Sequence, residues 1–196
     1  MRQRGAKMYH INSDKRCLKS AARISGALRK LLTEKQLTNI TVTDIQKASG
    51  TGRSTFYRLF DNIDDVLLYL AEEEFRDMAD LYRELSWEEF TGKLIAGIAE
   101  EGQELANIVS SGKAAVVSRA LRSELIHEAQ KDHRKFDNRS RYMISLFVGG
   151  CISLVAAWDE NGRSESIEEL TDIMQNAFDY TRIERTLARK DEGVER

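Results

Sequence analysis

The stretch from Gly52 to Phe60 constrains the fold of this chain most, because it can bury only one of its faces. At the helical angle of about 100° per residue, its apolar side chains fall on one side: Phe56, Leu59 and Phe60. The other side is polar and cationic, and it consists of Ser54, Thr55, Tyr57 and Arg58. A helix of about two turns is unstable alone in water. Neighbouring helices must therefore cover the apolar side, which leaves the polar side facing outward.

The residues before this stretch predict the first of those neighbours. Thr41 and Asp44 have the spacing of a capping box, in which each side chain bonds the other's backbone N–H at the start of a helix. A narrow apolar stripe follows, made of Val42, Ile45 and Ala48. Gly50 can adopt the left-handed conformation that ends a helix. The pattern predicts a helix, a tight turn and a second helix, which is the outline of a helix-turn-helix.

Together these segments resemble the DNA-binding domain of the tetracycline-repressor (TetR) family of bacterial transcription regulators. The residues that carry the resemblance are Ile40–Ile45, Ala48–Gly50 and Arg53–Phe60, and the similarity extends over about residues 15–70. Two positions depart from the family pattern. Gly52 stands where the family has Ser, Thr or Asn as the cap of the second helix, and Ile63 stands where it has a phosphate-binding Lys. The second departure removes one expected phosphate contact, which lowers the salt dependence of DNA binding.

The resemblance implies a set of DNA-contacting residues: Thr41, Thr43, Arg53, Ser54, Thr55, Tyr57 and Arg58. Arg58 is the best candidate to read a base, because an arginine can bond both acceptors of a guanine edge. Tyr57 would bind a phosphate, and Thr41 with Thr43 would anchor the first helix to the DNA backbone. The alternative for Tyr57 is packing beside Phe60, and both roles are compatible.

The whole chain is expected to be all-α. It contains no proline, shows little β-branched alternation, and has enough hydrophobic content, 41% of 196 residues, to bury a core. The resemblance implies about nine helices, with an N-terminal three-helix DNA-binding domain and a C-terminal helical domain for effector binding and dimerisation. We expect a mobile basic arm over residues 1–13 and the DNA-binding domain over residues 14–62. The effector and dimerisation domain would cover residues 63–186, and a frayed tail residues 187–196.

The first long helix is expected to begin near residue 13 and to end near residue 35. The side chains predicted to cover the helix-turn-helix recur at helical spacing, and they are Leu18, Ala21, Ala22, Ala27, Leu28, Leu31 and Leu32. A fourth helix would begin at the acidic cluster of residues 61–65, whose charges suit the positive end of a helix dipole. The resemblance implies that this helix links the DNA-binding domain to the rest of the chain.

Charge is distributed unevenly along the chain. Residues 1–60 hold 13 Lys or Arg against 3 acids, a balance of +10, and residues 61–196 hold 17 against 29, a balance of −12. A basic N-terminal domain suits a phosphate backbone, whereas an acidic remainder stays away from it. Chance segregation of solvated charge is the alternative. The arm would either reach an adjacent DNA groove or have no role. It lacks the apolar segment of a signal peptide, and Met8 is a second possible start.

Residues 142–158 carry no charge. Their length is just below that of a membrane span, so we predict a fully buried helix and keep a membrane helix as the alternative. The resemblance implies that this helix and the last one pair two copies of the chain into a four-helix bundle. The alternative is that both helices only cover the core of their own protomer. The expected dimer contacts are Gly149, Ser153, Ala157, Leu170, Ile173, Met174 and Ala177.

The resemblance also implies an effector pocket in the C-terminal domain. The aromatic residues available to line it are Tyr69, Tyr82, Trp87, Phe90, Phe136, Tyr142 and Phe147. Aromatic side chains at helical spacing also build plain cores, which is the alternative for all of them. The long uncharged stretch favours a small, neutral and apolar effector. A regulator that responds to a protein partner, or to no effector, would have the same sequence features.

Other classes of protein find less support. Glu124 and His127 have the Glu-x-x-His spacing of metal-dependent helical-bundle enzymes, but Gln130 stands where the second motif before His133 needs a carboxylate. A hydrolase would need a nucleophile with an activating base beside it. The chain has no Gly-x-Ser-x-Gly motif, and its 2 cysteines and 3 histidines form no such group in the sequence. We therefore expect no enzyme, cofactor or metal. The isolated cysteines are compatible with the reducing cytoplasm.

Overall fold

The computed structural model describes residues 9–81, 85–100, 104, 107–109, 111–131 and 137–177. Its helices in chain order are α1 (Lys15–Glu34), the 3-10 helix η1 (Leu37–Asn39), α2 (Val42–Ser49), α3 (Arg53–Leu59), α4 (Ile63–Leu81), α5 (Trp87–Glu100), α7 (Ala114–Lys131), α8 (Asn138–Glu160) and α9 (Ile167–Ala177). The described part of the chain contains no strand beyond one isolated bridge, between Tyr9 and Phe60. The expected all-α fold is confirmed.

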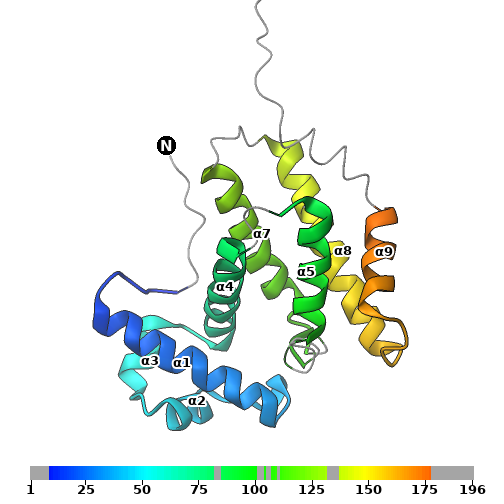
Figure 1. Cartoon of the computed structure of the whole chain (residues 1–196). Helices are drawn as coiled ribbons and strands as arrows, with labels where there is room; N and C mark the ends of the chain where they lie inside the picture. The colour runs from blue at the N-terminus through cyan, green and yellow to red at the C-terminus, as the bar shows by residue number, and fades with distance from the viewer. Residues whose placement is uncertain are drawn as a thin grey trace, which may run out of the picture.

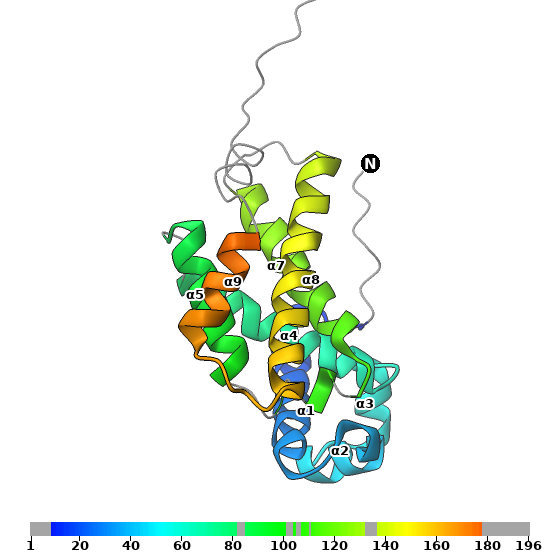
Figure 2. The same ribbon diagram turned by 90° about the vertical axis from the view of Figure 1, so that its right-hand side faces the viewer.

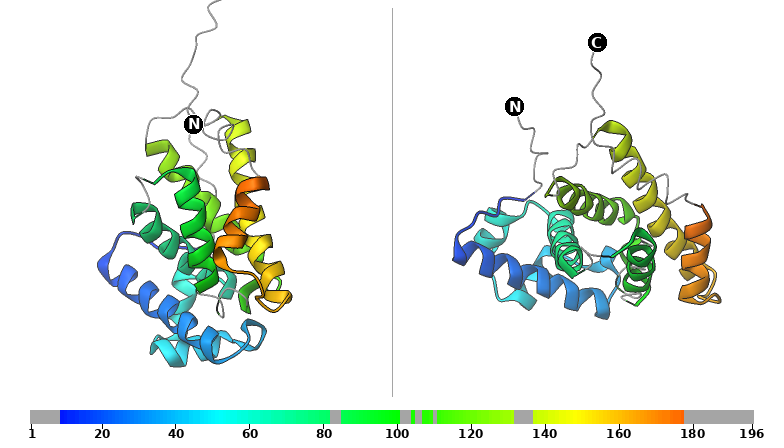
Figure 3. Two further views of the ribbon diagram at one scale, coloured as in Figure 1. Left: turned by 45° about the vertical axis from the view of Figure 1, so that its right-hand side comes forward. Right: turned by 45° about the horizontal axis from the view of Figure 1, so that its top comes forward.

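The helices are arranged in two groups that share α4. Helices α1, α2 and α3 lie together at one end of the molecule, and α5, α7, α8 and α9 form a bundle at the other end (Figures 1 and 2). Helix α4 packs against α1 on one side and against α7 on the other. The two views of Figure 3 show the same order, with α4 between the groups. Helix α4 therefore belongs to both groups, and a displacement of α4 would alter the packing of both.

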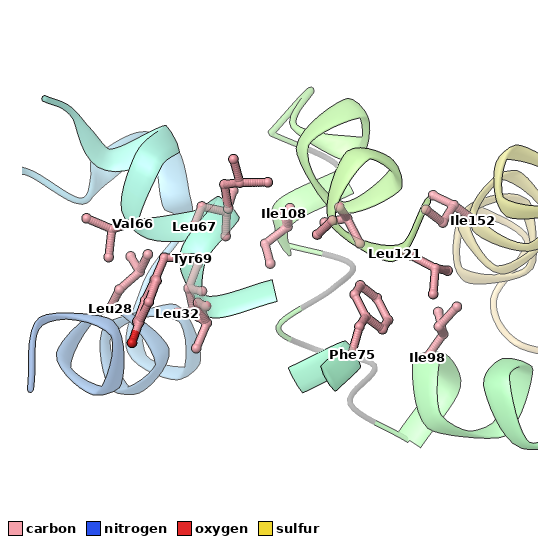
Figure 4. Close-up of a cluster of buried hydrophobic side chains, with 14 of the residues drawn as sticks. Leu28, Leu32, Val66, Leu67, Tyr69, Phe75, Ile98, Ile108, Leu121 and Ile152 are labelled. Atoms are coloured by element: carbon pink, nitrogen blue, oxygen red, sulfur yellow. The ribbon is translucent and has the colours of Figure 1, made fainter. Parts of the chain in front are cut away.

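A continuous apolar core runs through both groups. Figure 4 shows Leu28 and Leu32 of α1 near Val66 and Leu67 of α4, and further buried side chains continue through Leu121 to Ile152 of α8. Such a core ties the orientation of the N-terminal helices to the packing of the bundle.

The buried face of α1 differs from the predicted stripe at its edges. Leu18 is 43% exposed and Ala22 is exposed, whereas Ile24 and Ser25 are buried. The reason is the helical phase, because Ala22 is rotated by about 100° from its buried neighbour Ala21. In α2 the same kind of shift occurs: Ser49 is buried, and Ala48 of the predicted stripe is exposed.

The expected mobile arm is wrong for its last residues, while residues 1–8 lie outside the described part of the chain. Tyr9 is only 4% exposed and packs edge-on against Tyr69, with ring centroids 5.3 Å apart. Its hydroxyl donates a hydrogen bond to Glu72 Oε2 at 2.5 Å, and the backbone N–H of His10 donates to the carbonyl of Leu59 at 2.8 Å. The burial of an aromatic ring outweighs the polar composition around it, so Tyr9 and His10 pack on the N-terminal helices.

Helix α8 contains the uncharged stretch, but it is not the fully buried helix that we predicted. By length and composition it could cross a membrane, and 33% of its apolar window is buried. One side packs on α5, α7 and α9, whereas Leu146 is 61% exposed and Tyr142 is also exposed. A single helix of this kind is weak evidence for a membrane protein, and the other helices do not meet the same test within the described residues.

Candidate nucleic-acid interface

The first helix of the helix-turn-helix begins with the predicted capping box. The backbone N–H of Asp44 donates to Thr41 Oγ1 at 3.2 Å, and that of Thr41 donates to Asp44 Oδ2 at 2.9 Å. Both hydrogen bonds satisfy donors that the helix itself leaves without a partner. The predicted start of α2 at Val42 is thereby confirmed.

The turn between α2 and α3 depends on Gly50, which has the expected left-handed conformation with φ of 63°. Its backbone N–H donates to carbonyls in the last turn of α2, and the hydroxyls of Ser49 and Thr51 are 2.7 Å apart. A Cβ atom at Gly50 would lie 2.8 Å from Nη2 of Arg23 on α1. The turn is thus tight, and it is closed on one side by α1.

Helix α3 buries its apolar side and exposes its polar side, as predicted. Its apolar residues Phe56, Leu59 and Phe60 are fully buried. Gly52 occupies the N-cap position without a side-chain hydrogen bond, as expected for glycine. Ser54, Tyr57 and Arg58 are exposed, and Thr55 is half-buried. The helix therefore presents hydroxyl and guanidinium groups on a surface that its buried residues hold in place.

One contact on this surface was not expected from the sequence. The guanidinium of Arg53 lies over the ring of Tyr57 at 5.4 Å from the ring centroid, and the Tyr57 ring also meets Phe56 edge-on at 5.3 Å. A cation over an aromatic face is attracted to it. Tyr57 is 43% exposed, so its ring is held from two sides while part of the side chain remains at the surface. The spacing of one helical turn was the signal for this pair.

A second unexpected contact stabilises the start of α2. Lys35 Nζ lies 2.8 Å from Asp44 Oδ2, on the carboxylate that also accepts hydrogen bonds from Thr41. The Lys35 bond, and after it the Thr41 bonds, lower the pKa of the Asp44 carboxyl well below its usual range. Thr41 and Thr43 are exposed on the same end of α2. All seven residues predicted to contact DNA therefore lie on α3 or on the first turn of α2 with its cap.

The start of α4 lacks a cation of its own and is acidic. Ile63, which replaces the phosphate-binding Lys of the resembled family, is half-buried. Asp65 is fully buried and accepts a hydrogen bond from the backbone N–H of Asp61 at 2.8 Å, and burial raises the pKa of its carboxyl. Asp64 is paired with Lys113 at 2.7 Å.

Of the aromatic residues predicted for an effector pocket, the described ones occupy different parts of the molecule. Tyr69 packs in the N-terminal group and donates its hydroxyl to Glu73 at 2.7 Å, and Tyr142 is exposed on α8. Phe90 and Phe147 form a pair, with ring centroids 6.3 Å apart. Tyr82 and Phe136 lie outside the described residues, as does the side chain of Trp87. The effector pocket therefore stays a prediction, and Phe90 and Phe147 are its described residues that pack together.

The residues predicted for dimerisation divide into two sets. Leu170 and Met174 are buried inside the protomer, where α9 packs on α5, so this part of the prediction is corrected. The other five lie on the outside of α8 and α9: Gly149, Ser153, Ala157, Ile173 and Ala177. Leu146 lies on the exposed side of α8 as well, and Ile173 is 49% exposed. A row of apolar residues in the sequence does not reveal which of them face the protomer's own core and which face a partner.

The two residues that would form the metal site of an enzyme, Glu124 and His127, differ in exposure. Glu124 is buried on α7, whereas His127, one turn later, is exposed. Desolvation raises the pKa of the Glu124 carboxyl, and Arg76 opposes that change. Among the described residues, no group of three or more His, Cys, Asp or Glu side chains is placed to hold a metal ion.

The chain is similar to known proteins in its three-dimensional structure, whereas comparison of its sequence finds no match. At the level of sequence, no family model and no curated protein matches the chain. A TetR transcriptional regulator from Rhodococcus sp. RHA1 superposes with a TM-score of 0.64 at 16% identity, over 86% of this chain and 97% of that one. The chain has the TetR fold. Lin0861 from Listeria innocua is also similar, with a TM-score of 0.67 at 18% identity over 85% of this chain and 93% of that one.

A third structure with the TetR fold was determined with a bound small molecule. It is RolR in complex with resorcinol, with a TM-score of 0.50 at 14% identity, over 88% of this chain and 95% of that one. These similarities extend along most of both chains, so the C-terminal bundle belongs to the shared TetR fold together with the helix-turn-helix. At this level of identity they concern the arrangement of helices alone.

Proposed function

We propose that this protein is a sequence-specific DNA-binding transcriptional regulator. The observation that carries the proposal is the outward surface of α3, where Ser54, Tyr57 and Arg58 are exposed on a helix whose other face is fully buried. A helix of this kind fits the major groove, where side chains read base edges. The TetR fold supports the same role, because the similar structure from Rhodococcus sp. RHA1 is that of a transcriptional regulator.

The charge of the chain supports DNA as the partner. The excess of basic residues in the first 60 residues lies in the part that carries the helix-turn-helix, and the acidic excess lies in the remainder. Such a distribution orients the approach to a polyanion and makes binding depend on salt. We infer from DNA as the partner that the protein works in the cytoplasm.

We propose that the binding unit is a homodimer on a palindromic operator. The exposed apolar residues Leu146 and Ile173 lie on α8 and α9, beside the small residues of the same outer face. A two-fold pair of such faces would form a four-helix contact. Two copies of α3 would then enter successive major grooves, about 34–36 Å apart along the DNA.

We further propose repression that a small apolar effector relieves. RolR, which shares the fold, is described with resorcinol, a small aromatic molecule. In this chain the candidate region is the one around Phe90 and Phe147, whose rings pack together between α5 and α8. An effector would act by preferring a conformation in which the two helix-turn-helix units no longer match the spacing of the operator. A protein partner, or DNA binding without an effector, is the second candidate.

Selection of bound sequences from a random duplex library, at two salt concentrations, tests the proposal. We expect a palindromic motif whose two halves are about one helical turn apart, with affinity that falls steeply as salt rises. Weak binding without sequence preference would contradict the proposed function. In that case the Gly52 and Ile63 departures would account for the loss, and the function would have to be sought in the C-terminal bundle.

A further inference from the structure

A buried asparagine from the C-terminal group completes the end of the first helix. Asn107, 6% exposed, belongs to the connection between α5 and α7. Its Oδ1 accepts the backbone N–H of Leu37 at 2.8 Å, and its Nδ2 donates to the carbonyls of Leu32 at 3.0 Å and of Lys35 at 2.9 Å. The last carbonyls of a helix have no partner within it. A side chain some 70 residues later in the chain therefore serves as part of the C-terminal cap of α1.

The contacts continue from this cap to the helix-turn-helix. Lys35, whose carbonyl accepts from Asn107, places its Nζ 2.8 Å from Asp44 Oδ2. That same oxygen accepts both the backbone N–H and the hydroxyl of Thr41, at 2.9 and 2.7 Å. Asn107 is thus connected with the cap of α2 by hydrogen bonds at both ends of Lys35, at its backbone carbonyl and at its side-chain Nζ. Helix α2 immediately precedes α3.

Hydrogen bonds link Asn107 and Ile108 to residues 111–113, which lead into α7. The hydroxyl of Ser111 donates to the carbonyl of Asn107 at 2.6 Å, and the backbone N–H of Lys113 donates to the carbonyl of Ile108 at 3.1 Å. Gly112 permits this turn with φ of 73°. Lys113 then pairs with Asp64 at the start of α4, and Ile108 is buried in the cluster of Figure 4. Residues of this connection therefore contact the end of α1, through Asn107, and the start of α4, through Lys113.

We propose that Asn107 is a positioning residue through which the C-terminal bundle sets the orientation of the helix-turn-helix, an inference that rests on the proposed function. If the connection shifts, the amide loses its three hydrogen bonds together and leaves buried polar groups without partners. That cost favours discrete arrangements over gradual ones. A change in the packing of α5 and α7 would reach α2 by this route as well as through α4.

Hydrogen exchange without DNA tests the first half of the inference. The test variant is Asn107→Ala, and the control is Ser140→Ala, which removes the side-chain hydrogen bond of another buried polar residue, to Asp137 at the start of α8. We expect amide exchange over residues 53–60 to become about tenfold faster in Asn107→Ala and to stay unchanged in the control. A merely local role would speed exchange at residues 32–40 only. Unchanged exchange over 53–60, or equal acceleration in both variants, would overturn the inference.

Operator affinity tests the second half by a double-mutant cycle. We expect Asn107→Ala and Lys35→Met each to lower the affinity for the selected operator by about tenfold, because helix-turn-helix units that are less well positioned match the operator less often. The double variant should lose little more than either single variant, since both changes interrupt one route. Losses that multiply to about a hundredfold would show two independent effects and overturn the proposed route.

The two experiments separate this inference from the proposed function. If the unaltered protein selects no operator, the proposed function fails, and the exchange pattern alone then decides whether Asn107 positions α3. If the operator is bound and exchange over residues 53–60 does not respond to Asn107→Ala, the regulator stands and only the role of Asn107 is refuted.

Discussion

Tyr57 and Arg58 are neighbours on the exposed side of α3, but their chemistry gives them different tasks. We expect Arg58→Ala to reduce discrimination at one operator position by about 1–3 kcal/mol, the contribution of a bidentate arginine–guanine pair. Tyr57→Phe should weaken binding to all operator variants alike, because a phosphate contact carries no sequence information. Competition binding with single-base operator variants measures both effects. Equal losses for both variants on every operator would refute the assignment.

Burial of one carboxyl should give the protein a distinct dependence on pH. The pKa of Glu124 is raised, chiefly by desolvation, above its ordinary value of 4.5. The native state then binds this proton more readily than the unfolded state, so this residue's contribution to stability rises as pH falls through the raised pKa toward 4.5.

We therefore expect Glu124→Gln to be more stable relative to the unaltered protein at about pH 7 than at about pH 5. The neutral amide avoids the cost of a buried charge, and that cost disappears when the carboxyl is protonated. Chemical unfolding of both proteins at the two pH values measures the difference. A gain that is the same at both pH values would show that Glu124 is not desolvated in the way the structure describes.

At the scale of single elements, two glycines should respond in opposite ways to the same substitution. Gly26 lies within α1, and a Cβ there would meet nothing within 4 Å. We expect Gly26→Ala to stabilise the protein by about 0.5–1 kcal/mol, because alanine loses less backbone entropy in a helix. Gly50 has a left-handed backbone with φ of 63°, so Gly50→Ala should destabilise by about 1–2 kcal/mol. Urea unfolding measures both, and equal signs would contradict the turn geometry.

The elements that could be predicted from the sequence are those with local causes. The capping box at Thr41, the turn at Gly50 and the buried side of α3 all depend on residues within about one or two helical turns of each other. The contacts of Asn107 could not be predicted, because its partners are some 70 residues away and nothing in a lone asparagine reveals them. Leu170 was predicted as a dimer contact, and its burial could not be predicted because α9 packs on α5, which lies far away in the sequence.

At the scale of the whole molecule, an exposed leucine of α8 distinguishes two interpretations of the uncharged stretch, a dimer contact and a solvent-facing surface. Leu146 is 61% exposed in the protomer, on the same helix as the predicted dimer contacts. A leucine this exposed on a long apolar helix is better explained by a partner surface than by solvent. We expect Leu146→Lys to dissociate the proposed dimer, because a charge would be buried without a partner in the two-fold interface. Sedimentation equilibrium measures the mass directly.

The matched control is Leu18→Lys, which places the same charge at another exposed leucine, on α1, away from α8 and α9. It should leave the mass unchanged, so that any dissociation can be assigned to the α8–α9 face and not to added charge. In the Leu146→Lys monomer the helix-turn-helix remains folded, yet it contacts only one half of a palindrome, so the salt dependence of binding should fall to about half. A variant that stays dimeric with an unchanged salt dependence would place the dimer contact on another face. The exposed side of α8 would then need another occupant.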